Sequence, residues 1–229
     1  MDFTTMRVIA RIRSDFSSKF GIPRQSGLVE SLQATVVFEP EFRSAEALRG
    51  IEGYSHLWLI WQFSECVSED GAWSPTVRPP RLGGNKRVGV FATRAPYRPN
   101  PIGLSSVKLE RVDLHTPDGP VLVVSGADLM DGTPIYDIKP YLAYVDSHPD
   151  AKDGFALAQK EGVLEVECPP QLLERIPADK RQGLVDLLAQ DPRPQYQKDP
   201  DRVYQFEFAG LHVEFCVADG RLTVRDIVK

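Results

Sequence analysis

An almost continuous apolar run, HLWLIWQF from His56 to Phe63, constrains the fold of this chain more than any other segment. The run is short, rich in aromatic residues and closed by polar residues, which is typical of a buried β-strand rather than a helix. Other candidate strands are also short and are separated by turn-forming residues, at 6–13, 32–38, 87–93, 107–114, 120–127 and 134–139. Only one short helix is expected among them, at 44–50, with Ser44 as its N-cap. The pattern predicts an antiparallel barrel or sandwich.

The pattern changes after about residue 150. A helical stretch at 171–190, interrupted at Pro177, carries an apolar stripe of leucines. Three strands follow, at 203–208, 211–217 and 221–228. The last two are joined by Asp219-Gly220, a strong hairpin signal. We therefore predict a mainly β chain, with an N-terminal antiparallel β-barrel over residues 1–148 and a small α+β C-terminal domain over residues 149–229.

The segment from Arg78 to Arg111 concentrates positive charge in an acidic chain. It contains eight basic residues and one acid, Glu110, so its net charge is +7. The whole chain carries −5, which leaves −12 for the other residues. Five prolines and four glycines in the same segment fix the shape of its backbone. A stiff cationic segment of this kind predicts a surface that binds anions.

The sequence argues against several classes of function. Its three cysteines lie far apart without CxxC spacing, which argues against a disulfide framework and a zinc site and fits a reducing cytoplasm. The four histidines share no metal-ligand spacing, so we predict no metal. The N-terminus is not typical of a secretory signal, and no window is apolar enough to span a membrane. No GxSxG motif occurs, and no GxGxxG follows a strand.

Four segments resemble a known family in their order and spacing: GIPRQSGLV at 21–29, TVRPPRLGGNKRVGVFATRAPYRPNPIGLS at 76–105, DLMDGTPIYDIKPYLAYVD at 128–146 and LAQDPRPQYQ at 188–197. They are similar to the TsaA-like family, and within it to the bacterial TrmO group. The resemblance implies an antiparallel β-barrel that works as a cytoplasmic homodimer and binds S-adenosyl-L-methionine near the subunit interface. It also implies methyl transfer to the N6 atom of threonylcarbamoyladenosine at position 37 of tRNA, next to the anticodon.

The same resemblance implies a set of cofactor-binding residues, namely Pro23, Arg24, Gln25, Ser64, Glu65, Arg94, Leu104, Leu129, Met130, Asp131 and Gly132. At Ser64-Glu65 the chain departs from relatives that carry His-Gln, and a serine cannot replace a stacking imidazole. Arg94 precedes a rigid segment, where a guanidinium can bind a carboxylate or phosphate through two parallel hydrogen bonds. We expect Arg94, Asp131 and Arg24 to converge in one pocket. Without the resemblance, each of these positions also fits a turn or a core residue.

The candidate catalytic residues lie in two segments. The N6 atom of the modified adenosine is a poor nucleophile, because its lone pair is drawn into the ring and the adjacent carbonyl, so a base within hydrogen-bond reach would help. Asp137 is the candidate base, in a segment that also carries Lys139 and Tyr141. Asn100, held between two prolines, is a further candidate for directional hydrogen bonds. The alternatives are a structural Asp137–Lys139 ion pair and a turn-stabilising asparagine.

The basic segment supplies the candidate RNA-binding residues, namely Arg78, Arg81, Lys86, Arg87, Tyr97 and Arg98. The cations suit phosphates and the tyrosine suits an unpaired base, whereas the alternative is a solvated charged face. An alternative function is a non-catalytic RNA- or nucleotide-binding module on the same barrel, favoured by the Ser64-Glu65 departure. A small-molecule methyltransferase would need neither the basic segment nor the C-terminal domain. We expect truncation after Asp150 to weaken tRNA methylation while most of the cofactor affinity is kept.

Overall fold

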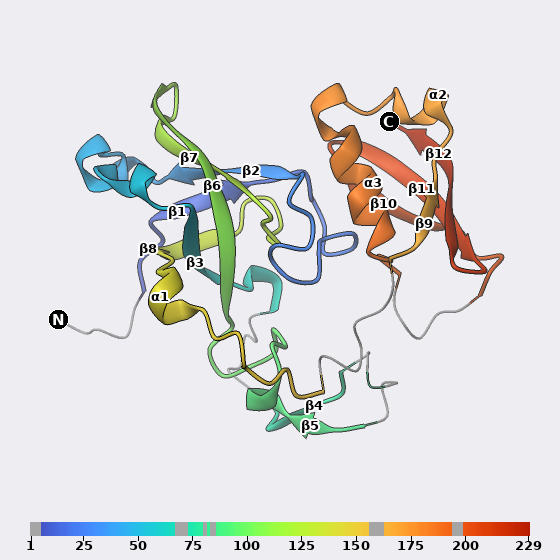
Figure 1. Cartoon of the computed structure of the whole chain (residues 1–229), viewed down its shortest axis with the longest axis horizontal. Coiled ribbons are helices and arrows are strands. Elements are labelled where there is room, and N and C mark those ends of the chain that lie inside the picture. The colour runs from blue at the N-terminus through green and yellow to red at the C-terminus, as the bar shows by residue number, and fades with distance from the viewer. Residues whose placement is uncertain (1–5, 67–72, 80–81, 83–85, 156–162, 194–198) are drawn as a thin grey trace.

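The computed structural model describes residues 6–66, 73–79, 82, 86–155, 163–193 and 199–229. Within these residues the strands form a closed barrel in the order β1-β2-β7-β6-β3-β8, a four-stranded sheet in the order β10-β11-β12-β9, and a two-stranded hairpin, β4-β5. Figure 1 shows the barrel on the left, the four-stranded sheet with its helices on the right, and the hairpin below. The closed barrel confirms the predicted mainly β fold class.

The strands of the barrel all pair antiparallel: β1 (Ala10–Arg13), β2 (Gln33–Phe38), β3 (His56–Gln62), β6 (Ile102–Thr116), β7 (Gly119–Ser125) and β8 (Pro134–Pro140). The apolar run that predicted a buried strand is β3. Its side chains alternate, because Leu57, Leu59 and Trp61 are buried in the barrel while the residues between them are half-buried. β3 lies between β6 and β8, so its backbone is paired on both sides, as a strand of this apolarity requires.

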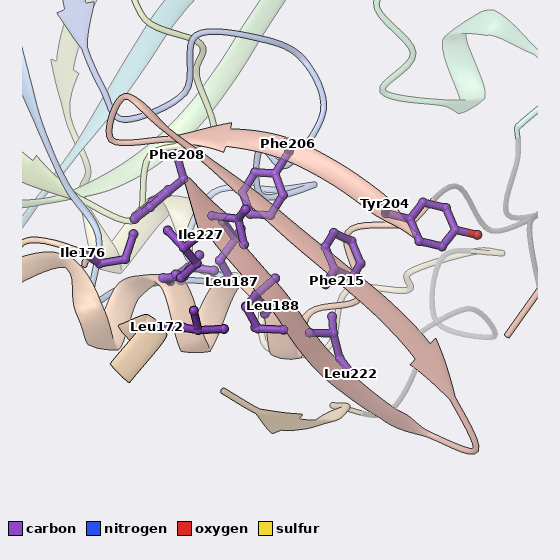
Figure 2. Packing of buried hydrophobic residues seen from close by; sticks show 14 of the residues in the cluster. Leu172, Ile176, Leu187, Leu188, Tyr204, Phe206, Phe208, Phe215, Leu222 and Ile227 are labelled. Carbon is purple, nitrogen blue, oxygen red and sulfur yellow. The ribbon is translucent and has the colours of Figure 1, made fainter. Parts of the chain in front are cut away.

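The C-terminal part contains two short α-helices and a four-stranded sheet: β9 (Glu165–Glu167), α2 (Pro170–Leu173), α3 (Arg181–Ala189), β10 (Tyr204–Phe208), β11 (Leu211–Ala218) and β12 (Arg221–Val228). β9 pairs parallel with β12, and the other pairs are antiparallel. Figure 2 shows Leu187 and Leu188 of α3 packed among Phe206, Phe208 and Phe215 of the sheet. The predicted leucine stripe and the hairpin at Asp219-Gly220 are confirmed.

The segment between β1 and β2 contributes to this second core as well as to the barrel. Phe16, Val29 and Leu32 are buried in the same cluster as the C-terminal aromatic residues. The Ser31 hydroxyl donates a hydrogen bond to the carboxylate of Asp186 in α3, and Lys180 forms an ion pair with Asp15. The loop 14–32 therefore packs the two halves of the chain against each other.

Some predicted elements differ in type. The helix predicted at 44–50 is a pair of 3-10 turns, η2 (Ala45–Leu48) and η3 (Ile51–Gly53), and Ser44 makes no side-chain capping bond. The strand predicted at 87–93 is β5 (Val88–Gly89) followed by the 3-10 turn η6 (Val90–Ala92), and among the described residues it pairs only with β4 (Thr76–Val77). The pairing ends at Val90: its N–H donates to the carbonyl of Pro75 at 3.0 Å, whereas its own carbonyl accepts from the N–H of Thr93 at 3.1 Å within the 3-10 turn.

Other elements differ in length. β1 begins four residues later than predicted, and β6 begins five residues earlier, directly after Pro101. The helix predicted at 171–190 is divided at Pro177 as expected, but α2 is only one turn long. Elements of two to four residues were not predicted, because they are too short to show a period: β4, β9, α1 (Ala143–Asp146) and the further 3-10 turns η1 (Pro40–Phe42), η4 (Ser64–Cys66) and η8 (Ala178–Lys180).

Candidate functional site

Three loops meet at the end of the barrel where β6 begins and β7 ends. The N–H of Gly27, in the loop before β2, donates to the carbonyl of Gly126, in the loop after β7, at 2.8 Å. The Nη1 atom of Arg94, in the loop before β6, donates to the side-chain Oε1 of Gln25. These contacts bring two of the predicted cofactor-binding residues, Gln25 and Arg94, together.

A buried chain of hydrogen bonds runs from the inside of the barrel to this end. Trp61 Nε1 donates to Ser105 Oγ at 2.9 Å, and the Ser105 hydroxyl donates to Asp128 Oδ1 at 2.5 Å. Ser105 is fully buried and Trp61 nearly so. The indole ring lies directly over Gly103, where an added Cβ would overlap it. The tight fit of Trp61 on Gly103 fixes the direction of the first hydrogen bond and hence the position of the Ser105 hydroxyl.

The carboxylate of Asp128 is the charged end of this chain. Burial raises its pKa, and hydrogen bonds from the Ser105 hydroxyl and from the backbone of Asp128 and Ser26 oppose that effect, as does the positive charge of Arg94. Arg94 therefore acts electrostatically on Asp128 while its side chain is held by Gln25. The result is a half-buried carboxylate beside an exposed guanidinium.

Sequence analysis did not identify Ser105 and Asp128 as site residues. They are 23 positions apart, and only the pairing of β6 with β7, in which Lys108 lies opposite Ser125, brings them together. Asp128 directly follows the predicted apolar strand, but that signal is weak, because many strands end in a polar residue. Both residues also lie in segments that resemble the family, Ser105 at the end of 76–105 and Asp128 at the start of 128–146.

Arg24 turns toward the C-terminal half. Its Nη2 atom donates to the backbone carbonyls of Asp191 at 2.7 Å and Arg193 at 2.8 Å, while the preceding Pro23 is buried. The two adjacent residues thus have different partners. The side chain of Gln25 accepts a hydrogen bond from Arg94, and the side chain of Arg24 donates to the segment after α3. The loop that carries them links the barrel end to the C-terminal part.

The stretch from Leu129 to Gly132 follows the outside of β1. Leu129 is buried in the barrel core, and the N–H of Ser14 donates to Asp131 Oδ1 at 3.0 Å. Asp131 lines an open groove of about 300 Å³ together with Gly132 and three arginines, Arg11, Arg13 and Arg43. The half-buried Met130 accepts hydrogen bonds at its carbonyl from Thr133. In this chain, Arg94, Asp131 and Arg24 each contact a different part of the molecule.

The departure at Ser64-Glu65 lies in η4, and both residues are exposed. Lys19 pairs with Glu65 Oε2 at 3.0 Å and donates to the Glu65 carbonyl at 3.2 Å. The pKa of Lys19 is raised, chiefly by its hydrogen bond to Glu65 and to a smaller extent by Cys66 and Tyr97. Glu65 is therefore engaged by the loop 14–32, close to Tyr97 and to the basic segment.

Leu104 lies on the outside of the barrel. It is opposite Ile60 in the pairing of β6 with β3, and it is 56% exposed. Ile102, two residues earlier on the same face of β6, is also exposed. The predicted cofactor contact at Leu104 is thus an apolar patch on the outer surface of the barrel.

The predicted catalytic residues also lie on the outside of the barrel. Lys139 Nζ is 2.8 Å from Asp137 Oδ2, both side chains are substantially exposed, and the ion pair raises the pKa of Lys139. The ring of Tyr141 lies 5.4 Å from that of Trp58. Asn100 is exposed, and its backbone carbonyl accepts a hydrogen bond from the N–H of Ile102 at 2.7 Å. The Asp137–Lys139 contact has the geometry of the structural alternative.

The predicted RNA-binding residues cluster on the hairpin and the loop that follows it. Arg78, Lys86 and Arg87 are exposed, and Arg87 Nη1 donates to Thr76 Oγ1 at 2.9 Å. None of these three cations is paired with an acid in the part of the chain that the structure describes. Tyr97 is exposed, whereas the half-buried Arg98 donates to the Thr93 carbonyl at 3.0 Å. Arg81 lies outside the described residues.

Over the described ranges, no group of three or more His, Cys, Asp and Glu side chains is placed to hold a metal ion. No helix in those ranges combines the length and apolarity needed to cross a membrane. Cys66, Cys168 and Cys216 are free thiols.

Comparison with known proteins defines the class as a tRNA methyltransferase built on a β-barrel. The family model of the tRNA-methyltransferase O N-terminal domain matches residues 11–147, and that of the TrmO C-terminal domain matches residues 163–229. The chain belongs to the tRNA-methyltransferase O family. This confirms the resemblance drawn from the four sequence segments, and with it the predicted class of enzyme.

Individual relatives match over nearly the whole chain. A protein of Escherichia coli K12 named tRNA (adenine(37)-N6)-methyltransferase is 41% identical over 224 residues, covering 94% of both chains. A putative S-adenosylmethionine-dependent methyltransferase of Pseudomonas aeruginosa is 42% identical, covering 90% of both chains. A crystal structure of TrmO from Pseudomonas aeruginosa superposes with a TM-score of 0.77 at 34% identity, covering 98% of each chain.

Proposed function

We propose that this chain transfers a methyl group from S-adenosyl-L-methionine to the N6 atom of threonylcarbamoyladenosine at position 37 of tRNA. Relatives named for methylation of this adenine and for this methyl donor support the proposal. The observation that carries it is the contact between Gln25 and Arg94 beside the half-buried carboxylate of Asp128. Arg94 of this centre belongs to the same basic segment of the chain as the exposed cations of the hairpin.

The residues at this end of the barrel suit S-adenosyl-L-methionine. When bound, the cofactor supplies a methyl group that is activated by a positively charged sulfur. Arg94 is exposed and can bind the carboxylate of the methionine moiety through two parallel hydrogen bonds, with Gln25 holding the guanidinium in place. Glu65 supplies a carboxylate for an ammonium group or for ribose hydroxyls. The donor set therefore matches a zwitterionic ligand, and the chain's main contribution is positioning.

The proton on N6 needs an acceptor, and two carboxylates compete for this role. Asp137 was predicted from the sequence, and it is held in an exposed ion pair with Lys139. Asp128 is half-buried, and burial raises its pKa above the ordinary value of an aspartate, which suits its carboxylate to accepting a proton. We propose that Asp128 takes the proton. The Asp137–Lys139 ion pair then has a structural role on the outer surface of β8.

The RNA-binding role is assigned to the hairpin and to the C-terminal part. The exposed Arg78, Lys86 and Arg87 provide phosphate contacts, which give affinity and salt dependence rather than sequence specificity. We propose residues 1–148 as the catalytic barrel and residues 149–229 as an aid to tRNA binding. The position of Leu104 on the outer surface supports a homodimer in which a second copy covers this face and completes the cofactor site. The cytoplasm, where tRNA is modified, is the proposed location.

Calorimetry and methylation assays test the proposal together. The full-length protein should bind S-adenosyl-L-methionine and should methylate tRNA from cells that make threonylcarbamoyladenosine, but not tRNA from cells that lack it. Asp128→Asn should keep cofactor binding and lose turnover, with Asp137→Asn as the matched comparison. Methylation of both tRNA pools alike would refute the proposed substrate. Cofactor binding without transfer to either pool would favour the non-catalytic binding module.

A further inference from the structure

The open end of the β4-β5 hairpin carries two large aromatic side chains that face solvent. Trp73 precedes β4 and is 50% exposed, while Phe91 follows β5 and is 72% exposed. Their ring centroids lie 6.1 Å apart with an angle of 34° between the planes. Figure 1 shows the hairpin below both the barrel and the C-terminal sheet.

The hairpin itself holds the two rings together. Thr76 pairs with Gly89 and Val77 with Val88, and the N–H of Val90 donates to the Pro75 carbonyl just beyond the strands. This register places residues 73–75 beside residues 90–91, so the rings are neighbours although 18 positions separate them. Their separation is typical of aromatic pairs that stabilise each other. The pair is therefore a built feature of the hairpin rather than two unrelated exposed residues.

The surroundings of the pair indicate what it binds. Arg78, Lys86 and Arg87 project from the same hairpin, and no acid in the described ranges neutralises them. An apolar protein partner would not require cations without counterions, whereas a nucleic acid presents a flat base for the rings and a phosphate for each cation. Single-stranded loops of RNA are bound in this way, with unstacked bases on aromatic side chains and the backbone along basic groups.

We infer that Trp73 and Phe91 form a stacking platform for an unpaired base of the tRNA anticodon loop, outside the methyl-transfer centre. The inference rests on the proposed function, because it takes RNA as the substrate. It adds a base contact to the phosphate contacts of Arg78, Lys86 and Arg87. Tyr97, the aromatic residue suggested by the sequence, lies beyond Arg94 and is a separate surface group.

Tryptophan emission tests the platform directly, since the chain has only three tryptophans and the other two, Trp58 and Trp61, are half-buried and buried. Adding a synthetic anticodon stem-loop RNA to the full-length protein should quench the emission of Trp73. Trp73→Phe should remove this signal and keep the affinity, because phenylalanine can still stack. Trp73→Ala and Phe91→Ala should weaken binding by between about fivefold and about a hundredfold, the range for loss of one stacked base.

Three controls separate base stacking from the loss of any exposed aromatic residue, from charge and from folding. Tyr144→Ala removes an aromatic residue that is 85% exposed on α1, and it should leave RNA affinity unchanged. Lys86→Ala with Arg87→Ala should reduce the slope of log Kd against log salt, whereas Trp73→Ala should lower affinity at an unchanged slope. Circular dichroism and cofactor binding of each variant verify that it is folded.

The outcomes distinguish this inference from the proposed function. RNA binding that leaves Trp73 emission unchanged, or equal RNA affinity in Trp73→Ala, would overturn the platform while the methyltransferase proposal stands. A shift of Trp73→Ala and Phe91→Ala from dimer to monomer on size exclusion, with no change in RNA affinity, would assign the rings to contact with a second copy and also overturn it. Absence of any RNA binding would overturn both proposals.

Discussion

Replacing Ser105 by alanine is the sharpest test of the buried chain at the barrel end. Ser105 is 0% exposed, accepts from Trp61 Nε1 and donates to Asp128 Oδ1. Without the hydroxyl, the indole N–H loses its acceptor inside the barrel, which costs about 1–3 kcal/mol for a buried unsatisfied donor. The hydrogen bond to a charged carboxylate contributes about 1.5–3 kcal/mol more. We therefore expect Ser105→Ala to lower the free energy of unfolding by about 3 kcal/mol.

Urea unfolding, followed by far-UV circular dichroism, measures this change. A loss of that size corresponds to a fall in Tm of roughly 6–12 °C for a chain of this length. Ser106→Ala is the matched control, because Ser106 is the next residue of β6, is half-buried and makes no side-chain hydrogen bond within the described part of the chain. A double-mutant cycle with Trp61→Phe isolates the indole contribution. If Ser105→Ala and Ser106→Ala differed by less than about 0.5 kcal/mol, the buried chain would be energetically irrelevant and the reasoning refuted.

Four further substitutions test contacts at this end of the barrel, with Gly89→Ala in the hairpin as a control. Burial raises the pKa of Asp128, and an acid whose folded-state pKa is raised loses native stability as the pH rises through that value. In urea titrations, the free energy of unfolding of the wild type relative to that of Asp128→Asn should therefore fall from acidic to neutral pH. A difference that stays constant with pH would contradict this. Gly103→Ala should lower stability by about 1–3 kcal/mol, because the new Cβ would overlap the indole ring, whereas Gly89→Ala, which meets open space, should not. Lys19→Met and Glu65→Gln should each change the free energy of unfolding by less than about 1 kcal/mol in the same assay, because both side chains are about half exposed. A larger loss would show that η4 depends on the Lys19–Glu65 ion pair.

The sequence predicted the elements whose side chains repeat with a clear period. β3, with its alternation of buried and half-buried residues, and the leucine stripe of α3 were both found from such patterns. β5 was predicted too long, because the apolar residues Val90 and Phe91 continue its pattern although the backbone turns after Gly89. A hydrogen bond from the N–H of Thr93 to the carbonyl of Val90 closes this turn, and residue type alone does not reveal it.

The sequence predicted site residues only where they lie in a motif that resembles the family. Arg94 and Gln25 were named from the resemblance, and their mutual hydrogen bond is a finding of the structure. Asp128 lay at the start of a quoted segment, but its importance depends on Ser105, which the strand register brings next to it. The sequence does not show which aspartates are buried. The half-buried Asp128 and the exposed Asp137 differ in their burial and in their hydrogen-bond and ion-pair partners, which only the structure shows.

The loop 14–32 changes what removal of the C-terminal part would do. From the sequence, truncation after Asp150 was expected to leave cofactor affinity largely intact. In the structure, Phe16, Val29 and Leu32 of this loop are buried in the C-terminal core, and the same loop carries Gln25 to Arg94. Truncation would expose these three apolar side chains and release the loop, so we now expect calorimetry of the truncated chain to show weakened cofactor binding as well. Unchanged cofactor affinity after truncation would mean that the barrel alone positions Gln25.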